Sequence, residues 1–398
     1  MKIKTRIISY ILTIILSTAF LYFGHLYTAK NLTLFENSGE TYSKRVKITK
    51  ITNTEESIDQ YLLDAGIQSQ PDIKINFEAK VLNGENKGEK IKAVQLIDGY
   101  MSKVSRPVEK GNTVYLYYST EGDYAGTWMF ADYDRLGKII ILLLLFFVAL
   151  IIFGRFQGIN TIISLSLTCL SVLWVFIPAV LTGKNIYLWS ILTCVYSIIV
   201  TLIIVYGIDK KSICATLGCS SGILIAGVLT LIMDKVMSLT GFVNQDCYYL
   251  TEMNINLRAL IFGAILIGAM GAIMDISISI SSSLYEVRDK AESITISDLI
   301  GSGFTIGRDI LGTMSNTLVL AYIGSSLSVI LVLCIYSASI LELLNRERII
   351  VELLQSLVGI IAILGTIPLT SIICGFIYRG KNEDNYLIVH KDRFESEE

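Results

Sequence analysis

Histidine and paired cysteine, the usual ligands of protein zinc sites, are scarce in this sequence. The chain has 2 histidines, His25 and His390, which stand in different regions, and none of its 7 cysteines forms a CxxC pair. Cys247 lies in a polar connection, whereas the other cysteines lie in or beside apolar runs, where cysteine behaves as a small hydrophobic residue. We therefore predict no metal site, no cofactor and no disulfide framework.

Charge is also scarce. Charged residues make up 17% of the chain, and the formal net charge is −2. A nucleic-acid-binding protein needs a basic face to neutralise phosphates, so the composition argues against a nucleic-acid partner. The sequence contains no GxxxxGK[ST] loop, so any pumping would be secondary or would use another subunit.

The chain has, instead, apolar residues in long uncharged runs. Hydrophobic residues make up 53% of the sequence, and the mean hydropathy is +0.59. A helix of about 20 apolar residues crosses a bilayer. We predict eight spans, near residues 7–27, 138–153, 159–181, 186–206, 212–233, 257–282, 310–336 and 349–377.

The first span begins like a signal peptide, with Lys2, Lys4 and Arg6 ahead of an apolar run. That run is about 20 residues long, which exceeds a typical cleaved core, and no small-x-small cleavage site follows it. We therefore interpret residues 1–27 as a retained signal anchor, with a cleaved signal peptide as the alternative.

Residues 28–136 differ in character from the rest of the chain. Apolar and polar residues alternate as they do in half-buried strands near 46–51, 73–81, 90–97 and 113–118. The second and third of these flank a turn-rich loop and predict a hairpin. A short helix is predicted over residues 55–65. We expect a small barrel or sandwich, and no catalytic constellation is present, so binding or spacing is the expected role.

The distribution of Lys and Arg among the short connections predicts the orientation. The connections on the side of the N-terminus carry more basic residues than those on the other side, and the richer side is normally cytoplasmic. We therefore predict both termini inside, residues 28–136 outside, a seven-span domain over 137–378 and a polar tail over 379–398. The fold class is an α-helical polytopic membrane protein with a β-rich extracytoplasmic domain inserted after the first span.

The span near 257–282 carries an acid and a series of hydroxyls where lipid allows neither. At about 100° per residue, one narrow face holds small residues in its first half and polar residues in its second. That face consists of Ala264, Gly268, Gly271, Asp275, Ser279, Ser282, Glu286 and Asp289. The small half allows a second helix to approach closely, and an ionisable group inside a span points to function. The alternative places Asp275 near the headgroups, where it caps a packing face.

A second polar face follows on the next span. Asp309, Thr313 and Asn316 recur at i, i+4 and i+7, and Gly312 lies on the adjacent face. Asn316 is about 12 Å along the helix from Arg308, well inside the hydrocarbon. These residues either line a polar path or hold helices together, which intramembrane Asn and Thr often do.

The connection between the two faces, residues 284–304, predicts an amphipathic stretch on the membrane surface. Leu284, Val287 and Ile294 alternate with charged residues there. Gly301, Gly303 and Gly307 then predict a flexible connection, either a gate or an ordinary turn.

These segments resemble the YibE/F-like family of bacterial multi-pass membrane proteins. The resemblance rests on Gly268 to Asp275, on the serine-rich stretch that follows, and on Gly307-Arg308-Asp309 through Asn316-Thr317-Leu318. It extends to the glycine-containing loop at 81–88 of the outer domain. The family implies an N-terminal anchor, an outer β-domain and a seven-span bundle. It implies no assigned activity and no catalytic residues.

Two functions remain open from the sequence. The first is a transporter or permease-like protein of the cell membrane, in which a small solute or ion passes along a polar path formed by Asp275, Ser279, Ser282, Asp309, Thr313 and Asn316. The second is a membrane scaffold whose residues 28–136 bind an envelope protein. Small-residue faces suit homo- or hetero-oligomers as well. We predict no enzymatic activity, because the flanks of the two aspartates do not match those of intramembrane aspartyl proteases.

Overall fold

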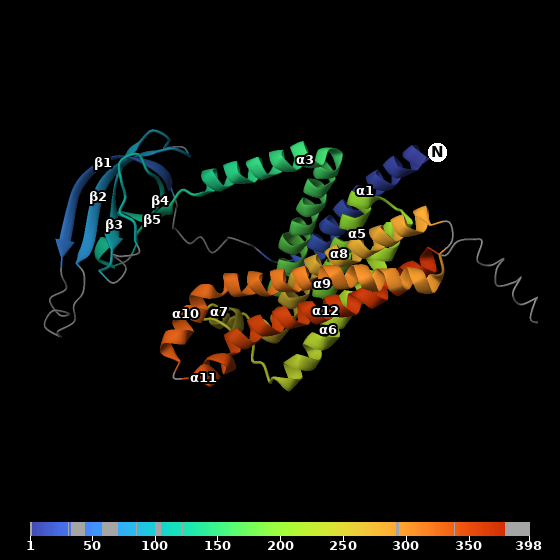
Figure 1. Cartoon of the computed structure of the whole chain (residues 1–398). Coiled ribbons are helices and arrows are strands. Elements are labelled where there is room, and N and C mark those ends of the chain that lie inside the picture. The colour runs from blue at the N-terminus through green and yellow to red at the C-terminus, as the bar shows by residue number, and fades with distance from the viewer. Residues whose placement is uncertain are drawn as a thin grey trace, which may run out of the picture. The chain divides into compact units, whose positions relative to one another are not determined.

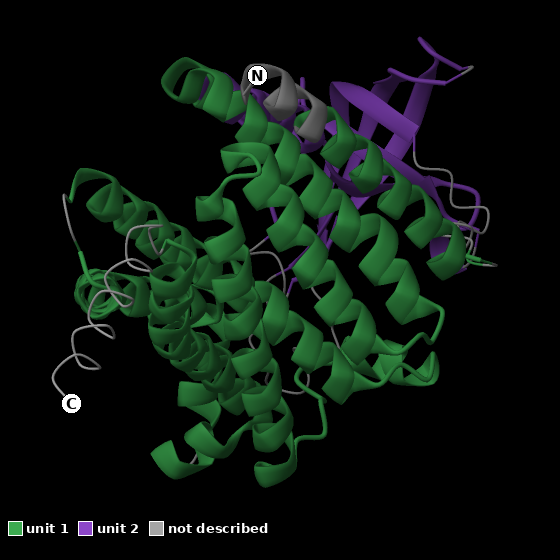
Figure 2. Cartoon of the chain, turned by 90° about the vertical axis from the view of Figure 1, so that its right-hand side faces the viewer, with its two compact units in different colours: residues 1–32, 150–398 green, residues 33–149 purple. Residues whose placement is uncertain are grey.

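The computed structural model describes residues 2–30, 32, 44–57, 71–84, 86–99, 105–120, 122–291, 294–337 and 339–378. The chain forms two compact units (Figure 2). One comprises Met1–Leu32 and Leu150–Glu398 and contains the helical bundle. The other, Thr33–Ala149, contains the β-strands. The predicted tail 379–398 lies outside the described residues.

Five strands form a closed barrel in the smaller unit. They are β1 (Lys44–Ser57), β2 (Asp72–Val81), β3 (Lys90–Ile97), β4 (Thr113–Tyr118) and β5 (Trp128–Tyr133), with a short 3₁₀ helix, η1 (Gly122–Tyr124), before the last. Their order around the barrel is β1-β2-β3-β5-β4. All neighbours are antiparallel except β3 and β5, which are parallel. The sheet therefore has no free edge, because β1 pairs with both β2 and β4.

The alternation seen in the sequence builds the barrel core. Val46 and Ile48 of β1 and Phe77 of β2 are almost fully buried. Within each strand, more exposed residues alternate with these buried ones. The predicted hairpin of β2 and β3 is confirmed, and of the two predicted shapes the barrel is the correct one. Residues 55–57 continue β1, so the helix predicted there is wrong for these three residues. Residues 58–65 lie outside the described part. Strand β5 was not predicted.

Twelve helical segments form the rest of the described chain (Figure 1). They are α1 (Lys2–Thr28), α3 (Leu136–Ser171), the π-helical turn η2 (Val172–Phe176), α4 (Ile177–Leu181), α5 (Ile186–Tyr206), α6 (Lys210–Val236), α7 (Cys247–Glu252), α8 (Leu257–Lys290), α9 (Ile296–Ser325), α10 (Leu327–Tyr336), α11 (Ile340–Asn345) and α12 (Glu347–Ile377).

Six helical segments are long and apolar enough to cross a membrane, or up to seven if the bent pair α9 and α10 is one span. The two helices of that pair meet at 63°. The protein is therefore a multi-pass membrane protein. One of the six segments, Leu136–Leu181, has 46 residues, about twice what one crossing needs. It covers both of the first two predicted spans after the barrel, and its backbone is non-helical at Arg155, between them.

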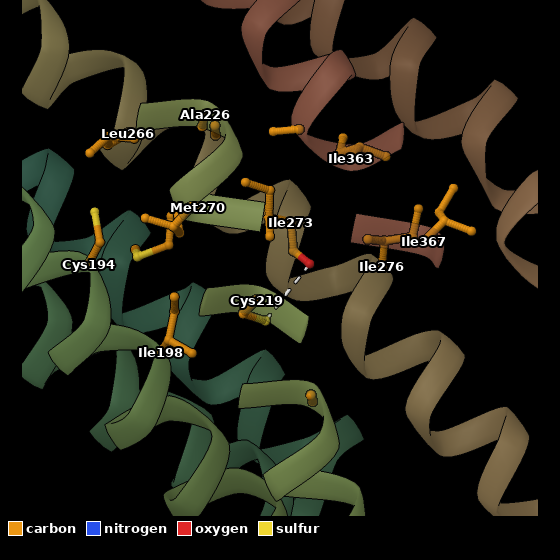
Figure 3. Packing of buried hydrophobic residues seen from close by; sticks show 14 of the residues in the cluster. Cys194, Ile198, Cys219, Ala226, Leu266, Met270, Ile273, Ile276, Ile363 and Ile367 are labelled. Atoms are coloured by element: carbon orange, nitrogen blue, oxygen red, sulfur yellow. Dashed lines mark hydrogen bonds between the residues drawn. The ribbon is translucent and has the colours of Figure 1, made fainter. Parts of the chain in front are cut away.

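The bundle core is built where α6, α8 and α12 pack against one another, with α9 against α12. Glycines allow the close approach: a Cβ on Gly222 of α6 would collide with Thr366 of α12, and one on Gly307 of α9 with Ile367. Figure 3 shows Cys219 and Ile273 in this core, where the Cys219 thiol lies 3.9 Å from the Ile273 carbonyl oxygen. Close helix packing of this kind replaces the hydrophobic effect inside a bilayer.

Two expectations about residues 284–304 are wrong. The segment does not form one surface stretch, because α8 continues to Lys290 and α9 already begins at Ile296. Leu284 and Leu299 are fully buried in the bundle core. Gly303 does not loosen the chain either. It is helical, and a Cβ there would collide with Ser371 of α12. The helix that was predicted to begin at residue 310 therefore begins at Ile296, and it packs against α12 at Gly303.

Candidate functional site: an open polar face on α8 and α9

The polar face of α8 is the open side of the helix. Ala264, Gly268, Gly271 and Asp275 are exposed in the single chain, and Ser279 is half-buried. Ser282 is also half-buried. The opposite side of α8 packs into the core through residues such as Ile273, Ile276 and Ile280. The predicted shared face therefore exists, and it points away from the core.

Asp275 has no hydrogen-bond or ion-pair partner among the described residues. The Ser279 hydroxyl donates to the Asp275 backbone carbonyl at 2.8 Å, so it stabilises the helix rather than the carboxyl group. The phenol of Tyr206, at the end of α5, is close enough for an electrostatic interaction with the acid. The carboxyl group is thus unpaired at the surface of the bundle.

Contacts between helices indicate how deep Asp275 lies. The Ser281 hydroxyl donates to the Lys211 carbonyl at 2.7 Å, next to the charged start of α6. Asp275 precedes Ser281 by six residues, about 9 Å along the helix. It is also only two residues from Ile273, which contacts Cys219 in the interior of α6. The acid therefore lies within the apolar length of the bundle, in the half nearer Lys211.

The second polar face is open as well. Asp309, Thr313 and Asn316 of α9 are exposed, and so is Gly312. Thr313 donates to the Ile310 carbonyl of its own helix at 2.9 Å. Asp309 and Asn316 form no side-chain hydrogen bond or ion pair within the described residues.

The two faces lie along neighbouring, antiparallel parts of the helix pair. Near one end, a Cβ on Gly303 of α9 would lie 3.0 Å from the Leu284 side chain of α8. Near the other end, a Cβ on Gly268 of α8 would lie 2.7 Å from the Tyr322 hydroxyl of α9. All six predicted path residues lie between these two contacts. In the part of the chain that the structure describes, no hydrogen bond joins the two sets.

The four predicted packing residues divide into two kinds. Gly268 is approached by Tyr322 of α9 and by the Gln355 amide of α12, which also donates to the Ala264 carbonyl at 3.4 Å. Gly271 and Gly312, in contrast, have nothing within 4 Å of a Cβ position. Packing inside the single chain therefore gives no reason for glycine at these two positions, both of which belong to the open faces.

Three cavities in the described residues lie away from these faces. One of about 530 Å³ lies between α10 and the residues that begin α12, and one of about 10 Å³ lies beside Asp234 and Arg258. The third, of about 730 Å³, belongs to the barrel unit. None of the three is lined by a predicted path residue. No group of three or more His, Cys, Asp or Glu that could hold a metal occurs among the residues described.

Two serines that hold α8 in the bundle were not predicted from the sequence. Ser277 and Ser281 are buried, and they lie 3.3 Å from the Thr370 hydroxyl and 2.9 Å from the Tyr378 hydroxyl, respectively. They share a face with Leu284, so the helical period could have separated them from Ser279 and Ser282. At the start of α12, Glu347 accepts hydrogen bonds from the backbone N–H groups of Thr240 (2.8 Å) and Gly241 (2.6 Å).

A known protein family matches the helical part of the chain. The family model of the YibE/F-like proteins matches residues 142–380, more than half of the chain. The chain belongs to the YibE/F-like family. The match includes both open faces of this YibE/F-like protein and excludes the barrel. No curated protein and no solved structure matches the chain.

Proposed function

We propose that this YibE/F-like protein is a transporter or permease-like protein whose path for a small solute or ion runs along the open faces of α8 and α9. One observation carries the proposal: Asp275 is exposed and unpaired among the described residues, about 9 Å along α8 from the level of the Lys211 carbonyl. A carboxyl group at such a depth is costly against lipid and is found where helices line a wetted route.

The residues around the acid support the same proposal. Thr313 and Asn316 of α9 add hydroxyl and amide groups to the neighbouring open face. Carboxylate, hydroxyl and amide oxygens can replace the water around a cation or hold a chain of water for proton transfer. In this proposal Asp275 or Asp309 binds the cation or carries the proton.

Open polar faces inside a bilayer need a cover that excludes lipid. We propose that a second copy of the chain supplies it, because Gly271 and Gly312 leave room for a helix that is not in the single chain. The same faces carry Asp275 and Arg308, which are both exposed and of opposite charge. Two copies therefore offer complementary charges to each other.

The experiment is flux across proteoliposome membranes. Purified protein is reconstituted, and the movement of protons and of monovalent cations is followed with and without a membrane potential. Asp275→Asn should abolish the flux, while Asp234→Asn should leave it unchanged, since Asp234 lies beside a different cavity. Unchanged flux in Asp275→Asn would remove the proposed path.

A second candidate function is a membrane-anchored scaffold, and the barrel unit favours it. A closed five-stranded barrel presents a stable surface for binding, and the family match does not extend over it. A scaffold role predicts that deletion of residues 28–136 abolishes function. The same deletion should also abolish the crosslinking of an envelope protein to the chain. The scaffold role also predicts that Asp275→Asn alters stability only. We propose no enzymatic role in either case.

The proposed location is the cell membrane, with both termini in the cytoplasm and residues 28–136 outside. The distribution of Lys and Arg supports this orientation. Labelling of single cysteines at Lys92 in the barrel and at Asp209 before α6, with a reagent that does not cross membranes, tests it in intact cells. Only the barrel position should react from outside.

A further inference from the structure

The barrel unit contains a polar cavity where strands β3 and β5 separate. These strands pair at only two positions, Ala93 with Trp128 and Val94 with Met129. Beyond them, Gln95 and Phe130 line a cavity of about 730 Å³. The cavity also includes Lys138, in the first turn of α3, so it lies at the point where the chain leaves the barrel.

Hydrogen bonds fix the backbone on one wall of this cavity. The buried Gln95 amide donates to the Arg106 carbonyl at 3.0 Å and accepts from the Val108 N–H at 2.8 Å. The Tyr133 hydroxyl donates to the same Arg106 carbonyl at 2.7 Å. Burial raises the pKa of Tyr133, so the hydroxyl keeps its proton and its hydrogen bond at neutral pH. The backbone that carries the Arg106 side chain is therefore held in place.

The charges that line the cavity are unbalanced. The Arg45 guanidinium donates to the buried Asp134 carboxylate at 2.8 Å, and Arg135 pairs with Asp132 at 2.8 Å. Arg106 and Lys138 form no ion pair among the described residues. These two cations are exposed and line the same cavity. An anion entering it meets two positive charges that no carboxylate neutralises.

The position of Lys138 along the chain indicates which anions are available to the cavity. Lys138 precedes the uninterrupted apolar run of α3, so it stands at the boundary between water and a candidate membrane span. Phosphate groups of phospholipids lie at that level, and basic residues there attract anionic lipids.

We propose that this cavity binds a phosphate-bearing anion, with Arg106 and Lys138 as its principal contacts. The anion is either the headgroup of an anionic phospholipid or free phosphate, because both present the same oxygens. A guanidinium group can contact two of these oxygens at once, and an ammonium group adds a point charge. This site does not depend on the transport proposed for α8 and α9.

The test uses the full chain in nanodiscs, with Trp174 and Trp189 replaced by Phe so that the remaining reporter is Trp128 of β5, two residues from Phe130 of the cavity wall. One arm measures the dissociation constant for phosphatidylglycerol in phosphatidylcholine nanodiscs. The other titrates inorganic phosphate with phosphatidylcholine alone. The cavity variant is Arg106→Gln with Lys138→Gln. The matched control is Lys90→Gln with Lys92→Gln, which removes two exposed charges of β3 outside the cavity.

Loss of both cavity cations should weaken binding about 30-fold in at least one arm, since each basic residue near a membrane surface contributes about fivefold and the two factors multiply. The arm that responds identifies the source of the phosphate group. The control should change binding less than the cavity variant does. Equal weakening by both double variants, or no dependence on Arg106 and Lys138 in either arm, would overturn the proposal.

Discussion

The Ser281 hydroxyl of α8 lies 2.9 Å from the Tyr378 hydroxyl at the end of α12. Both side chains are buried, and Ser281 also donates to the Lys211 carbonyl of α6. Three helices of the core are therefore joined by one pair of hydroxyls, close to the charged start of α6.

Removal of one of these hydroxyls should loosen the bundle. Tyr378→Phe is expected to reduce the free energy of unfolding by about 1–3 kcal/mol, because it leaves the buried Ser281 with fewer partners. Thermal unfolding in detergent measures the change. Tyr285→Phe is the matched control, since the Tyr285 ring packs edge-on against Tyr378 and its hydroxyl forms no hydrogen bond among the described residues. An equal loss in both variants would show that the hydroxyl pair is unimportant.

Two glycines of α9 should respond differently to the same substitution. Gly307→Ala places a Cβ against Ile367 of α12 and is expected to destabilise the bundle by about 1–3 kcal/mol. Gly312→Ala meets nothing within 4 Å and should be neutral or slightly stabilising in the monomer, because alanine favours helix by about 1 kcal/mol. Unfolding of both variants in detergent provides the comparison. The packing of α9 against α12 is contradicted if Gly307→Ala is as stable as Gly312→Ala.

The barrel should lose stability in acid through Asp132. The backbone N–H of Tyr133, and then the Arg135 side chain, lower the pKa of this carboxyl group below 3.8. Because the folded state prefers the charged form, this contribution is present above about pH 4 and disappears as pH falls through the lowered pKa. It should be below about 1 kcal/mol, since the pair is exposed.

Unfolding followed by Trp128 fluorescence, with Trp174 and Trp189 replaced by Phe, measures this dependence. Asp132→Asn should reduce the pH dependence of the free energy of unfolding between pH 5 and pH 3. Arg135→Gln should reduce it only in part, because the backbone N–H remains. If Arg135→Gln removes the whole dependence, the backbone hydrogen bond is not the larger cause.

A second copy over the open faces predicts a specific crosslink. Cysteine at Gly312 should form a dimer with a short bifunctional reagent in membranes, in a chain whose exposed Cys169 and Cys334 are replaced by Ser. Cysteine at Leu224, an exposed apolar position of α6, should not. Efficient crosslinking at Leu224 alone would place the interface elsewhere on the bundle.

Local sequence patterns predicted most of the elements. Strands β1 to β4 follow from alternation within each segment, and the spans follow from length and hydropathy. Strand β5 could not be found in this way, because Trp128 to Tyr133 lies just before a span and its parallel pairing with β3 joins distant segments. The true start of α9 was also missed, since the span was predicted to begin near residue 310, after the charged Arg308 and Asp309.

The helical period also predicted which residues share the candidate site. It placed Asp275 with Gly271 and Ser279, and the structure shows these residues on one face of α8. It could not show that the face is open, because that depends on where α6 and α12 pack. The period also separates Ser277 and Ser281 from Ser279, but it could not show that they are buried, because their partners, Thr370 and Tyr378, are more than 90 residues away.

The accessibility of the open faces to water tests the central claim most directly and requires no knowledge of the substrate. Single cysteines are placed at Ser279, at Asn316 and, as a lipid-facing control, at Leu357 of α12, in membranes containing the otherwise unreactive chain. A charged methanethiosulfonate reagent, which reacts only in water, should modify the cysteines at Ser279 and Asn316 quickly and the one at Leu357 slowly. Equally slow modification at all three positions would contradict a wetted path along α8 and α9.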